Sequence, residues 1–359
     1  MGLTPQKQPA LGPLRTLLPL TLGLFVIVWM LSDTWQKHGG WDALEGAVVL
    51  PSWPKSVATL LALVLLRDVA YVCRLKWLAH HGLSWRQAIE MTVLWEFASA
   101  ITPGIVGGGA VAIWGLHRQG MSAGRSTALV FSTVLLDEMF YVLSVPILLL
   151  SMGSAARPEG VGHDFGWGLF WAGWGLLLLL AMVIGFGLFL APMTTYRIIR
   201  STGSWRPLRR WRRAIFRFAK DLNESARQMK ALSPWRWAAA FAATILSWSA
   251  RFLCLVAVMG IVVAPMETLD AALIVARQLV MWVFLLVSPT PGSSGVAEWL
   301  LGVFFEPWMA LAPSPLAPAM TMLIWRTATH FIYLLIGVLV IPGWLRQSRL
   351  RNPIQSPDL

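Results

Sequence analysis

Ten ionisable side chains lie inside apolar stretches of the sequence, where a charge is costly. They are Arg67, Asp68, Arg74, Glu96, Asp137, Glu138, Arg251, Arg277, Glu298 and Arg326. In apolar surroundings such residues usually pair with one another or mark a polar cavity with a function. Guanidinium groups bind phosphate and carboxylate oxygens through paired hydrogen bonds, and carboxylates can compete for the same groups. The set therefore predicts a polar cavity that binds an anionic group.

The spacing of these residues indicates which of them share a helix face. Arg67, Tyr71 and Arg74 are four and three residues apart, so on a helix they lie on one face. Asp137 and Glu138 are adjacent and point to different sides, so one could face a cavity and the other a neighbouring helix.

A purely structural interpretation is also open for each of these charges. Asp68 could pair with Arg67, and Asp137 could pair with Arg326 to fix the helix register, because buried ion pairs do not by themselves imply function. Arg74 could extend its guanidinium to the membrane surface.

Two stretches rich in glycine and proline interrupt the apolar runs: "ITPGIVGGG" and "SPTPGSSGVAEW". Each precedes a short helical segment, and free N–H groups at a helix N-terminus attract anions. The same glycines and prolines could simply turn the chain inside a membrane. The candidate binding residues in these stretches are Thr102, Pro103, Gly104, Gly107, Gly108, Thr290, Pro291, Gly292, Ser293, Ser294 and Gly295.

The composition indicates an integral membrane protein made of helices. Of 359 residues, 57% are hydrophobic and 13% are charged, and the mean hydropathy is +0.63. Soluble domains carry about 25% charged residues, and several stretches approach the roughly 20 apolar residues that cross a bilayer. They lack the alternation of a membrane β-barrel. The net charge of +12 is concentrated in loops and tails, which favours cytoplasmic flanks and anionic headgroups over nucleic acid.

Six stretches are predicted to span the membrane, and two pairs of shorter ones are predicted to form re-entrant helical hairpins. The spans are 14–33, 57–79, 126–152, 165–195, 235–263 and 317–342, and the pairs are 86–101 with 104–116 and 269–288 with 293–305. We expect an uncleaved first helix, because no small-residue cleavage site follows its apolar run. Both termini should lie in the cytoplasm, because the excess of Lys and Arg lies in 197–230 and in the C-terminal tail.

The order of these features suggests an inverted repeat. "TPG" recurs 188 residues apart, and Arg67 with Arg251 and Asp137 with Arg326 recur at offsets of 184 and 189. The loop charges place one hairpin entering from inside and the other from outside, as in many transporters. The predicted division is a first span and external loop (1–56), repeat 1 (57–152), a connecting span (153–195), a basic linker (196–234), repeat 2 (235–342) and a basic tail (343–359).

The linker contains a predicted amphipathic helix over 205–230. Its apolar residues recur every three or four positions from Trp205 to Met229, with basic residues between them. We expect it to lie on the inner leaflet, where it could attract anionic lipids or only anchor the topology.

The stretch "FASAITPGIVGGGAVAIWGLHRQGMSAGRSTALVFSTVLLDEM" and the later "SPTPGSSGVAE" resemble the flippase-like transmembrane family. This family also forms the lipid-translocating part of bacterial lysylphosphatidylglycerol synthases. The resemblance covers about residues 57–342. It implies inverted repeats, re-entrant segments and movement of lipids between leaflets. By motif it points to Pro103, Gly104, Gly107, Gly108, Asp137, Pro291, Gly292, Gly295, Glu298 and Arg326.

The sequence and the resemblance together favour a lipid translocase in the bacterial inner membrane. Its expected partner is an anionic phospholipid or a polyprenyl-phosphate lipid, and we expect no cofactor and no metal site. The synthases carry a soluble aminoacyl-transfer domain after the membrane part, whereas this sequence shows only a short basic tail there, so we expect no lysine transfer. No G-x-x-x-x-G-K-[ST] motif is present. Movement would then be downhill or coupled to a proton or ion. A membrane-embedded enzyme acting on a lipid phosphate and a non-transporting scaffold are the alternatives.

Overall fold

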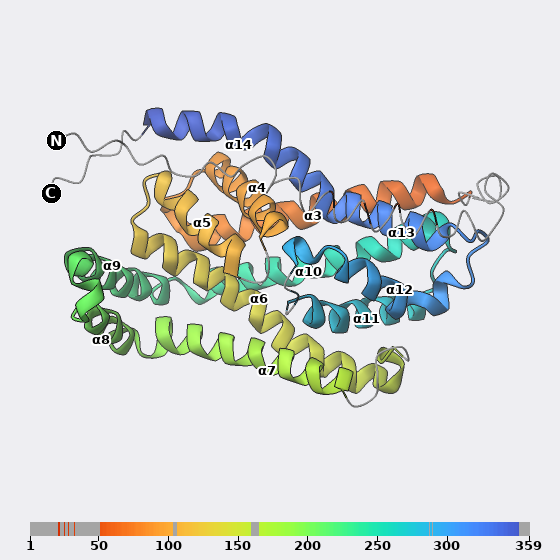
Figure 1. The fold of residues 1–359 in the computed structure, drawn as a ribbon, viewed down its shortest axis with the longest axis horizontal. Coiled ribbons are helices and arrows are strands. Elements are labelled where there is room, and N and C mark those ends of the chain that lie inside the picture. The colour runs from red at the N-terminus through yellow and green to blue at the C-terminus, as the bar shows by residue number, and fades with distance from the viewer. Residues whose placement is uncertain are drawn as a thin grey trace.

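The computed structural model describes residues 51–102, 106–158, 165–286, 288 and 290–351, together with Thr21, Phe25, Val28 and Ser32. Every regular element in these residues is a helix (Figure 1). The long helices are α3 (Trp53–Ala79), α4 (Trp85–Ile101), α5 (Val106–Arg118), α6 (Ala123–Met152), α7 (Phe165–Gly185), α8 (Pro192–Thr202), α9 (Arg212–Lys230), α10 (Pro234–Val262), α11 (Thr268–Leu286), α12 (Val296–Met309), α13 (Ala317–Arg326) and α14 (Ile332–Arg351).

Short helical turns connect several of these helices. Two of them are π-helical, η3 (Phe186–Leu190) and η6 (Thr327–Phe331). The others are 3₁₀ turns: η1 (His80–Gly82), η2 (Gly153–Ala156), η4 (Arg206–Trp211) and η5 (Pro291–Ser293). Because η6 joins α13 directly to α14, the two helices form one continuous apolar element.

Within the described residues, six helical stretches are long and apolar enough to cross a membrane: Trp53–Gly82, Ala123–Ala156, Gly166–Leu190, Pro234–Val262, Thr268–Leu286 and Ala317–Ile341. Five of them coincide with predicted spans. The predicted span 14–33 falls outside the described residues except for its four helical, exposed positions. The prediction that 269–288 is too short to span the membrane is wrong, because α11 has 19 residues and is apolar enough to cross it. By contrast, α4, α5 and α12, with 17, 13 and 14 residues, fall short of an ordinary span.

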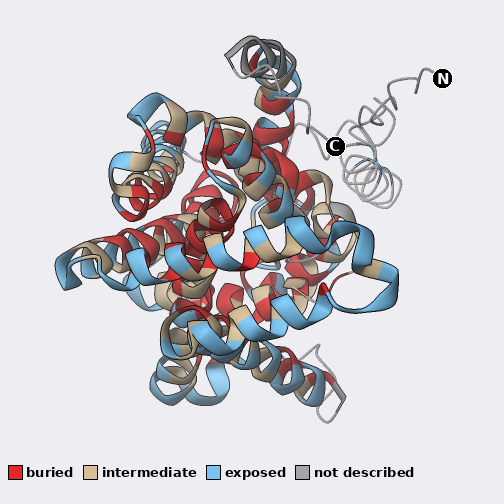
Figure 2. Cartoon of the chain, turned by 90° about the vertical axis from the view of Figure 1, so that its left-hand side faces the viewer, coloured by how far each residue is buried: buried red, intermediate tan, exposed pale blue. Residues whose placement is uncertain are grey.

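Large apolar side chains cover the outside of the helices. Leu61 and Leu65 on α3, Ile147 and Leu150 on α6, and Val183 on α7 are all exposed. Figure 2 shows the exposed faces turned outward and the buried faces turned toward the middle of the bundle. A soluble protein rarely exposes apolar surface on this scale, whereas a lipid-facing surface is expected to look this way.

Close backbone approaches hold the two halves of the chain together. α3 packs along α10, and Ser52 and Ser56 both donate hydrogen bonds to the carbonyl of Gly260, at 3.3 and 3.1 Å. A β-carbon at Gly260 would come within 2.8 Å of the Ser56 hydroxyl. Small residues permit such approaches between membrane helices, so this contact positions α3 against α10.

The predicted amphipathic helix over 205–230 is correct only for its second part. α8 ends at Thr202, η4 follows with Pro207 in its first turn, and α9 begins at Arg212. Proline lacks a backbone N–H and interrupts a continuing helix. Leu222 and Met229 of α9 are buried in a cluster with residues of α6, so this apolar face packs on protein.

α9 is fixed to α6 by a carboxylate cap. Asp221 accepts hydrogen bonds from the Ser122 hydroxyl, at 2.8 Å, and from the Gly124 N–H, at 2.7 Å. These donors lie at the N-terminus of α6, where a negative charge is stabilised by unpaired N–H groups and the helix dipole.

Candidate functional site: a polar cavity between the two halves

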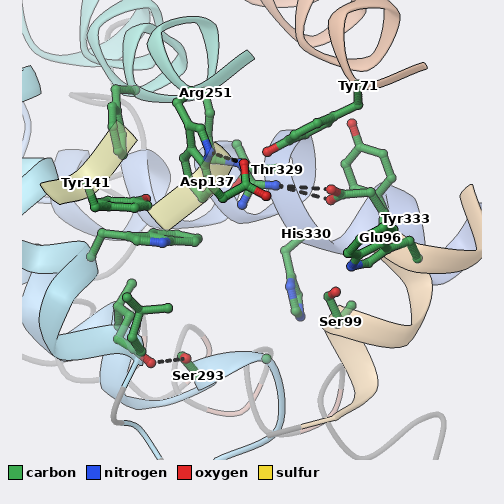
Figure 3. Close-up of a pocket in the computed structure, with 18 of the residues that line it drawn as sticks. Tyr71, Glu96, Ser99, Asp137, Tyr141, Arg251, Ser293, Thr329, His330 and Tyr333 are labelled. Atoms are coloured by element: carbon green, nitrogen blue, oxygen red, sulfur yellow. Dashed lines mark hydrogen bonds and ion pairs between the residues drawn. The ribbon is translucent and has the colours of Figure 1, made fainter. Parts of the chain in front are cut away.

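A polar cavity of about 260 Å³ lies where α3, α4 and α6 meet α10, α11, η5 and the α13–α14 element. Figure 3 shows labelled side chains from both halves of the sequence converging on it. Ten predicted site residues line it: Tyr71, Arg74, Glu96, Thr102, Asp137, Glu138, Arg251, Gly292, Ser293 and Arg326. The cavity therefore gathers three arginines and three acids from helices that are far apart in sequence.

Glu96 lies between two arginines. It accepts hydrogen bonds from Arg67 of α3 and from Arg251 of α10, the latter at 3.1 Å. Arg67 is fully buried beneath this contact and does not line the cavity, whereas Arg251 does. The two arginines that recur at an offset of 184 residues thus meet at one carboxylate.

Asp68 does not line the cavity and is hydrogen-bonded to the opposite half of the chain. Both of its oxygens lie within hydrogen-bonding distance of the Tyr333 hydroxyl, at 2.8 and 2.9 Å. Its nearest contact with the Arg67 guanidinium is 3.8 Å, so the predicted local pair exists but is long. Tyr71 lies within cation–π distance of Arg67 and Arg74, at 5.6 and 4.9 Å, which confirms that the three residues share a face.

Asp137 pairs with Arg74. Their nearest atoms are 2.5 Å apart, and the Trp248 indole N–H donates to the same carboxylate oxygen at 2.7 Å. The predicted pair of Asp137 with Arg326 is therefore wrong. Arg74 is 5% exposed, so its extension to the membrane surface is also wrong, because the guanidinium bonds to the half-buried Asp137 carboxylate.

Arg326 pairs with Glu298 behind the cavity wall. Their contact is 2.6 Å, and Glu298 also accepts from the Gly295 N–H at 2.6 Å. Glu298 is fully buried and does not line the cavity, so its predicted place in the polar cavity is wrong. It occupies the third position of α12, from which a carboxylate can reach back to cap the helix.

The second glycine-rich stretch is held in its turn by Arg326. The guanidinium donates to the carbonyls of Gly292 and Ser293 at 3.3 to 3.4 Å. Gly292 and Gly295 adopt φ angles of 56° and 85°, in the left-handed region that favours glycine. The Gly292 N–H also contacts the Thr102 carbonyl at 3.4 Å, so the two glycine-rich stretches touch.

The remaining predicted residues occupy varied places. Thr290 bonds to Ser288 through their hydroxyls at 3.0 Å, and Ser294 is buried. A β-carbon at Gly108 would come within 2.1 Å of the Ser99 hydroxyl, so this glycine allows α4 to approach α5. Gly107 and Pro291 lie in α5 and η5, and Pro103 and Gly104 fall outside the described residues.

Arg277 does not reach the cavity. It donates to the carbonyls of Ala155, at 3.2 Å, and Phe304, at 2.9 Å. Arg277 therefore connects η2 to α12. Its position does not support the prediction that it binds substrate.

Several cavity residues were missed by the sequence reasoning. His330 and Tyr333 follow Arg326 at four and seven residues on the α13–α14 element, and both line the cavity. This spacing on an apolar helix is a signal that could have revealed them. Trp248, Trp282, Trp325 and Gln278 also line it, but without coordinates nothing distinguishes them from interfacial or core residues.

The fold and the site together define a multi-pass helical membrane protein with a charged cavity between its two halves. The family model of the lysylphosphatidylglycerol synthase TM region matches residues 16–337, and the chain belongs to this family. It is also similar to a UPF0104 membrane protein of Archaeoglobus fulgidus, with 23% identity over 300 residues that cover 78% of this chain and 83% of that protein.

Proposed function

We propose that this protein is a lipid translocase that moves an anionic phospholipid or a polyprenyl-phosphate lipid between leaflets. The observation that carries the proposal is the single cavity to which both halves contribute arginines, Arg74 from α3 and Arg251 and Arg326 from α10 and α13. A guanidinium binds phosphate through directed, charge-assisted hydrogen bonds. The chain belongs to the family of the lysylphosphatidylglycerol synthase TM region, and this membership supports a role in lipid handling.

Arg251 is the best placed of the three to receive a phosphate. Arg74 and Arg326 hold carboxylates at 2.5 and 2.6 Å, whereas Arg251 shares Glu96 with Arg67 at 3.1 Å. Its Nε is buried without a hydrogen-bond partner. A phosphate oxygen would satisfy that group and compete with Glu96 for the guanidinium, and the return of Glu96 would favour release.

The aromatic lining suits the first apolar carbons beside a headgroup. Trp248 and Trp282 lie within cation–π distance of Arg251, at 5.1 and 5.2 Å, and Trp325 lines the same space. These rings provide an apolar surface next to the charged group. The acyl or polyprenyl chains would remain in the bilayer while the headgroup crosses.

The membrane arrangement belongs to the same proposal. We place α4 with α5 as a re-entrant hairpin and α11 with α12 as its counterpart in an inverted repeat, in which α11 is long enough to span. Both termini then lie in the cytoplasm of a bacterium, with the chain in its inner membrane. The contact between Thr102 and Gly292 and the convergence of Arg67 and Arg251 on Glu96 support this arrangement. Sites of such transporters lie at the repeat interface.

The test is lipid movement in proteoliposomes that contain a fluorescent anionic phospholipid or polyprenyl-phosphate analogue. The wild type should move the analogue faster than empty liposomes. Arg251→Gln should lower the rate about tenfold to a hundredfold, because a charged hydrogen bond contributes about 1.5–3 kcal/mol. Arg86→Gln is the matched control, since this arginine of α4 is exposed. The proposal fails if neither analogue moves above the empty-liposome rate.

A further inference from the structure

Glu138 differs from the other acids of the cavity because it has no cationic partner within the described residues. Glu96 and Asp137 are each held by arginine. Glu138 is 4% exposed, it lines the cavity, and its Oε2 is buried without a hydrogen-bond partner. The negative charges of Glu96 and Asp137 are thus compensated by arginines, and that of Glu138 is not.

Several polar groups on the helices packed against α6 already have hydrogen-bond partners. Arg74 bonds to Asp137, Arg251 bonds to Glu96, and the Gln278 amide donates to the Phe252 carbonyl. The Tyr141 hydroxyl, about one helical turn after Glu138, is buried without a partner, as are the Nε atoms of Arg74 and Arg251. The groups that α6 and these helices bring to the cavity include Asp137 and Tyr141 of α6, Tyr71 and Arg74 of α3, Trp248 and Arg251 of α10 and Gln278 of α11.

In the part of the chain that the structure describes, the other helices packed on α6 bring no further charge to Glu138. α7 contains no ionisable residue. α5 ends in His117 and Arg118, and α9 contacts α6 through Asp221 at Gly124. Gly124 precedes Glu138 by 14 residues, which is about 21 Å along a helix.

An ionised carboxylate that is buried without a partner is strongly disfavoured, and binding a proton removes the charge. Two neighbouring acids in different environments commonly differ in this way, one staying ionised, as Asp137 would beside Arg74, and the other binding a proton, as Glu138 would. We propose that Glu138 is the proton-binding residue that couples lipid movement to a proton gradient. This inference rests on the proposed translocase function.

The proposed step is balanced in charge. With the cavity open to one side, the Glu138 carboxylate takes one proton from water and becomes a neutral carboxyl group. With the cavity open to the other side, the carboxyl group returns that proton to water. Asp137 keeps Arg74, and Glu96 keeps Arg67 while the phosphate displaces it from Arg251, so one proton crosses in each cycle.

The experiment uses proteoliposomes that contain an anionic lipid analogue and have an imposed pH gradient. Valinomycin with the same potassium concentration on both sides holds the membrane potential at zero. With one proton per lipid, the wild type should build a transbilayer ratio of the analogue of about tenfold per pH unit, because one proton then carries about 1.4 kcal/mol for each unit. Glu138→Gln should give an even distribution at every gradient. Glu224→Gln changes an exposed carboxylate on α9 and should behave as the wild type.

The outcomes separate this inference from the proposed function. If the wild type moves the lipid analogue but leaves it evenly distributed between leaflets under a pH gradient, proton coupling is overturned. The proposed translocase function is then unaffected. A Glu138→Gln variant that still builds the ratio overturns the assignment to this residue. No lipid movement by the wild type refutes the translocase and this inference with it.

A second measurement does not depend on the variant. A pH-sensitive dye inside wild-type proteoliposomes should report proton movement when the anionic analogue is added outside, and empty liposomes should not. A constant internal pH during lipid movement overturns the proposal even if Glu138→Gln does not fold.

Discussion

Replacing Glu96 with glutamine removes a carboxylate that bonds to two guanidinium groups. Arg67 and Arg251 are balanced by Glu96 and Asp68, so the substitution leaves one uncompensated positive charge beside the fully buried Arg67. Removing one partner of a buried ion pair costs about 3–5 kcal/mol. Asp68 remains at 3.8 Å from Arg67, and Arg251 borders the cavity, so we expect the lower end of that range.

The assay is the free energy of unfolding in mixed micelles with rising denaturing detergent. A loss of about 3 kcal/mol lowers the ratio of folded to unfolded protein by roughly a hundredfold. Glu90→Gln on the same helix is the control. Its partner Arg86 has a side chain that is 67% exposed, and an exposed pair contributes about 1 kcal/mol or less.

A second variant tests whether the effect is electrostatic. Arg67→Met with Glu96→Gln removes one charge of each sign, and replacing a buried pair with apolar groups is often neutral. The double variant should therefore be more stable than Glu96→Gln alone. If Glu96→Gln destabilises the protein no more than Glu90→Gln, or if the double variant is less stable than the single one, the charge-balance reasoning is refuted.

Two further predictions concern the glycine-rich turn and the α6 cap. Gly292→Ala should lower both stability and lipid movement, because a left-handed alanine costs about 1–2 kcal/mol and its β-carbon would lie 2.3 Å from His330. Gly302→Ala is the control: its added β-carbon would lie 3.6 Å from the nearest atom, so the thermal unfolding midpoint should change little. Asp221→Asn should cost about 1 kcal/mol, measured by the same detergent titration, and hydrogen exchange should rise at Gly124; unchanged exchange there would contradict the cap.

Much of the helical architecture could be predicted from local sequence. Five of the six stretches that can span a membrane follow directly from apolar runs, because hydropathy depends only on neighbouring residues. α11 was misjudged because the glycine-rich stretch after it suggested a hairpin before its length was considered. The face of α9 was assigned to lipid because an amphipathic pattern does not reveal whether protein or membrane covers it.

Several partners of the charged residues could not be predicted, because those pairs join helices distant in sequence. Arg74 and Asp137 are 63 residues apart, and Arg251 and Glu96 are 155 apart. The equivalence of Arg67 and Arg251 was visible as a repeat offset, but the carboxylate between them was not. Glu298 was the exception that local rules could have placed, since it lies three residues after Gly295 at the start of a helix.

The central claim is that the lipid headgroup passes through the cavity between the two halves, and a block placed inside it tests this most directly. Thr329 lines the cavity, whereas Thr327 on the same turn is exposed and does not. Both hydroxyls bond to a carbonyl one turn earlier at 2.7 Å, so they are matched. In a protein with Cys73 and Cys254 replaced by alanine, each threonine is changed to cysteine and labelled with a bulky thiol reagent. Labelled Thr329→Cys should move lipid no faster than empty liposomes, and labelled Thr327→Cys should keep its rate. Equal and undiminished rates in the two labelled proteins would contradict passage through this cavity.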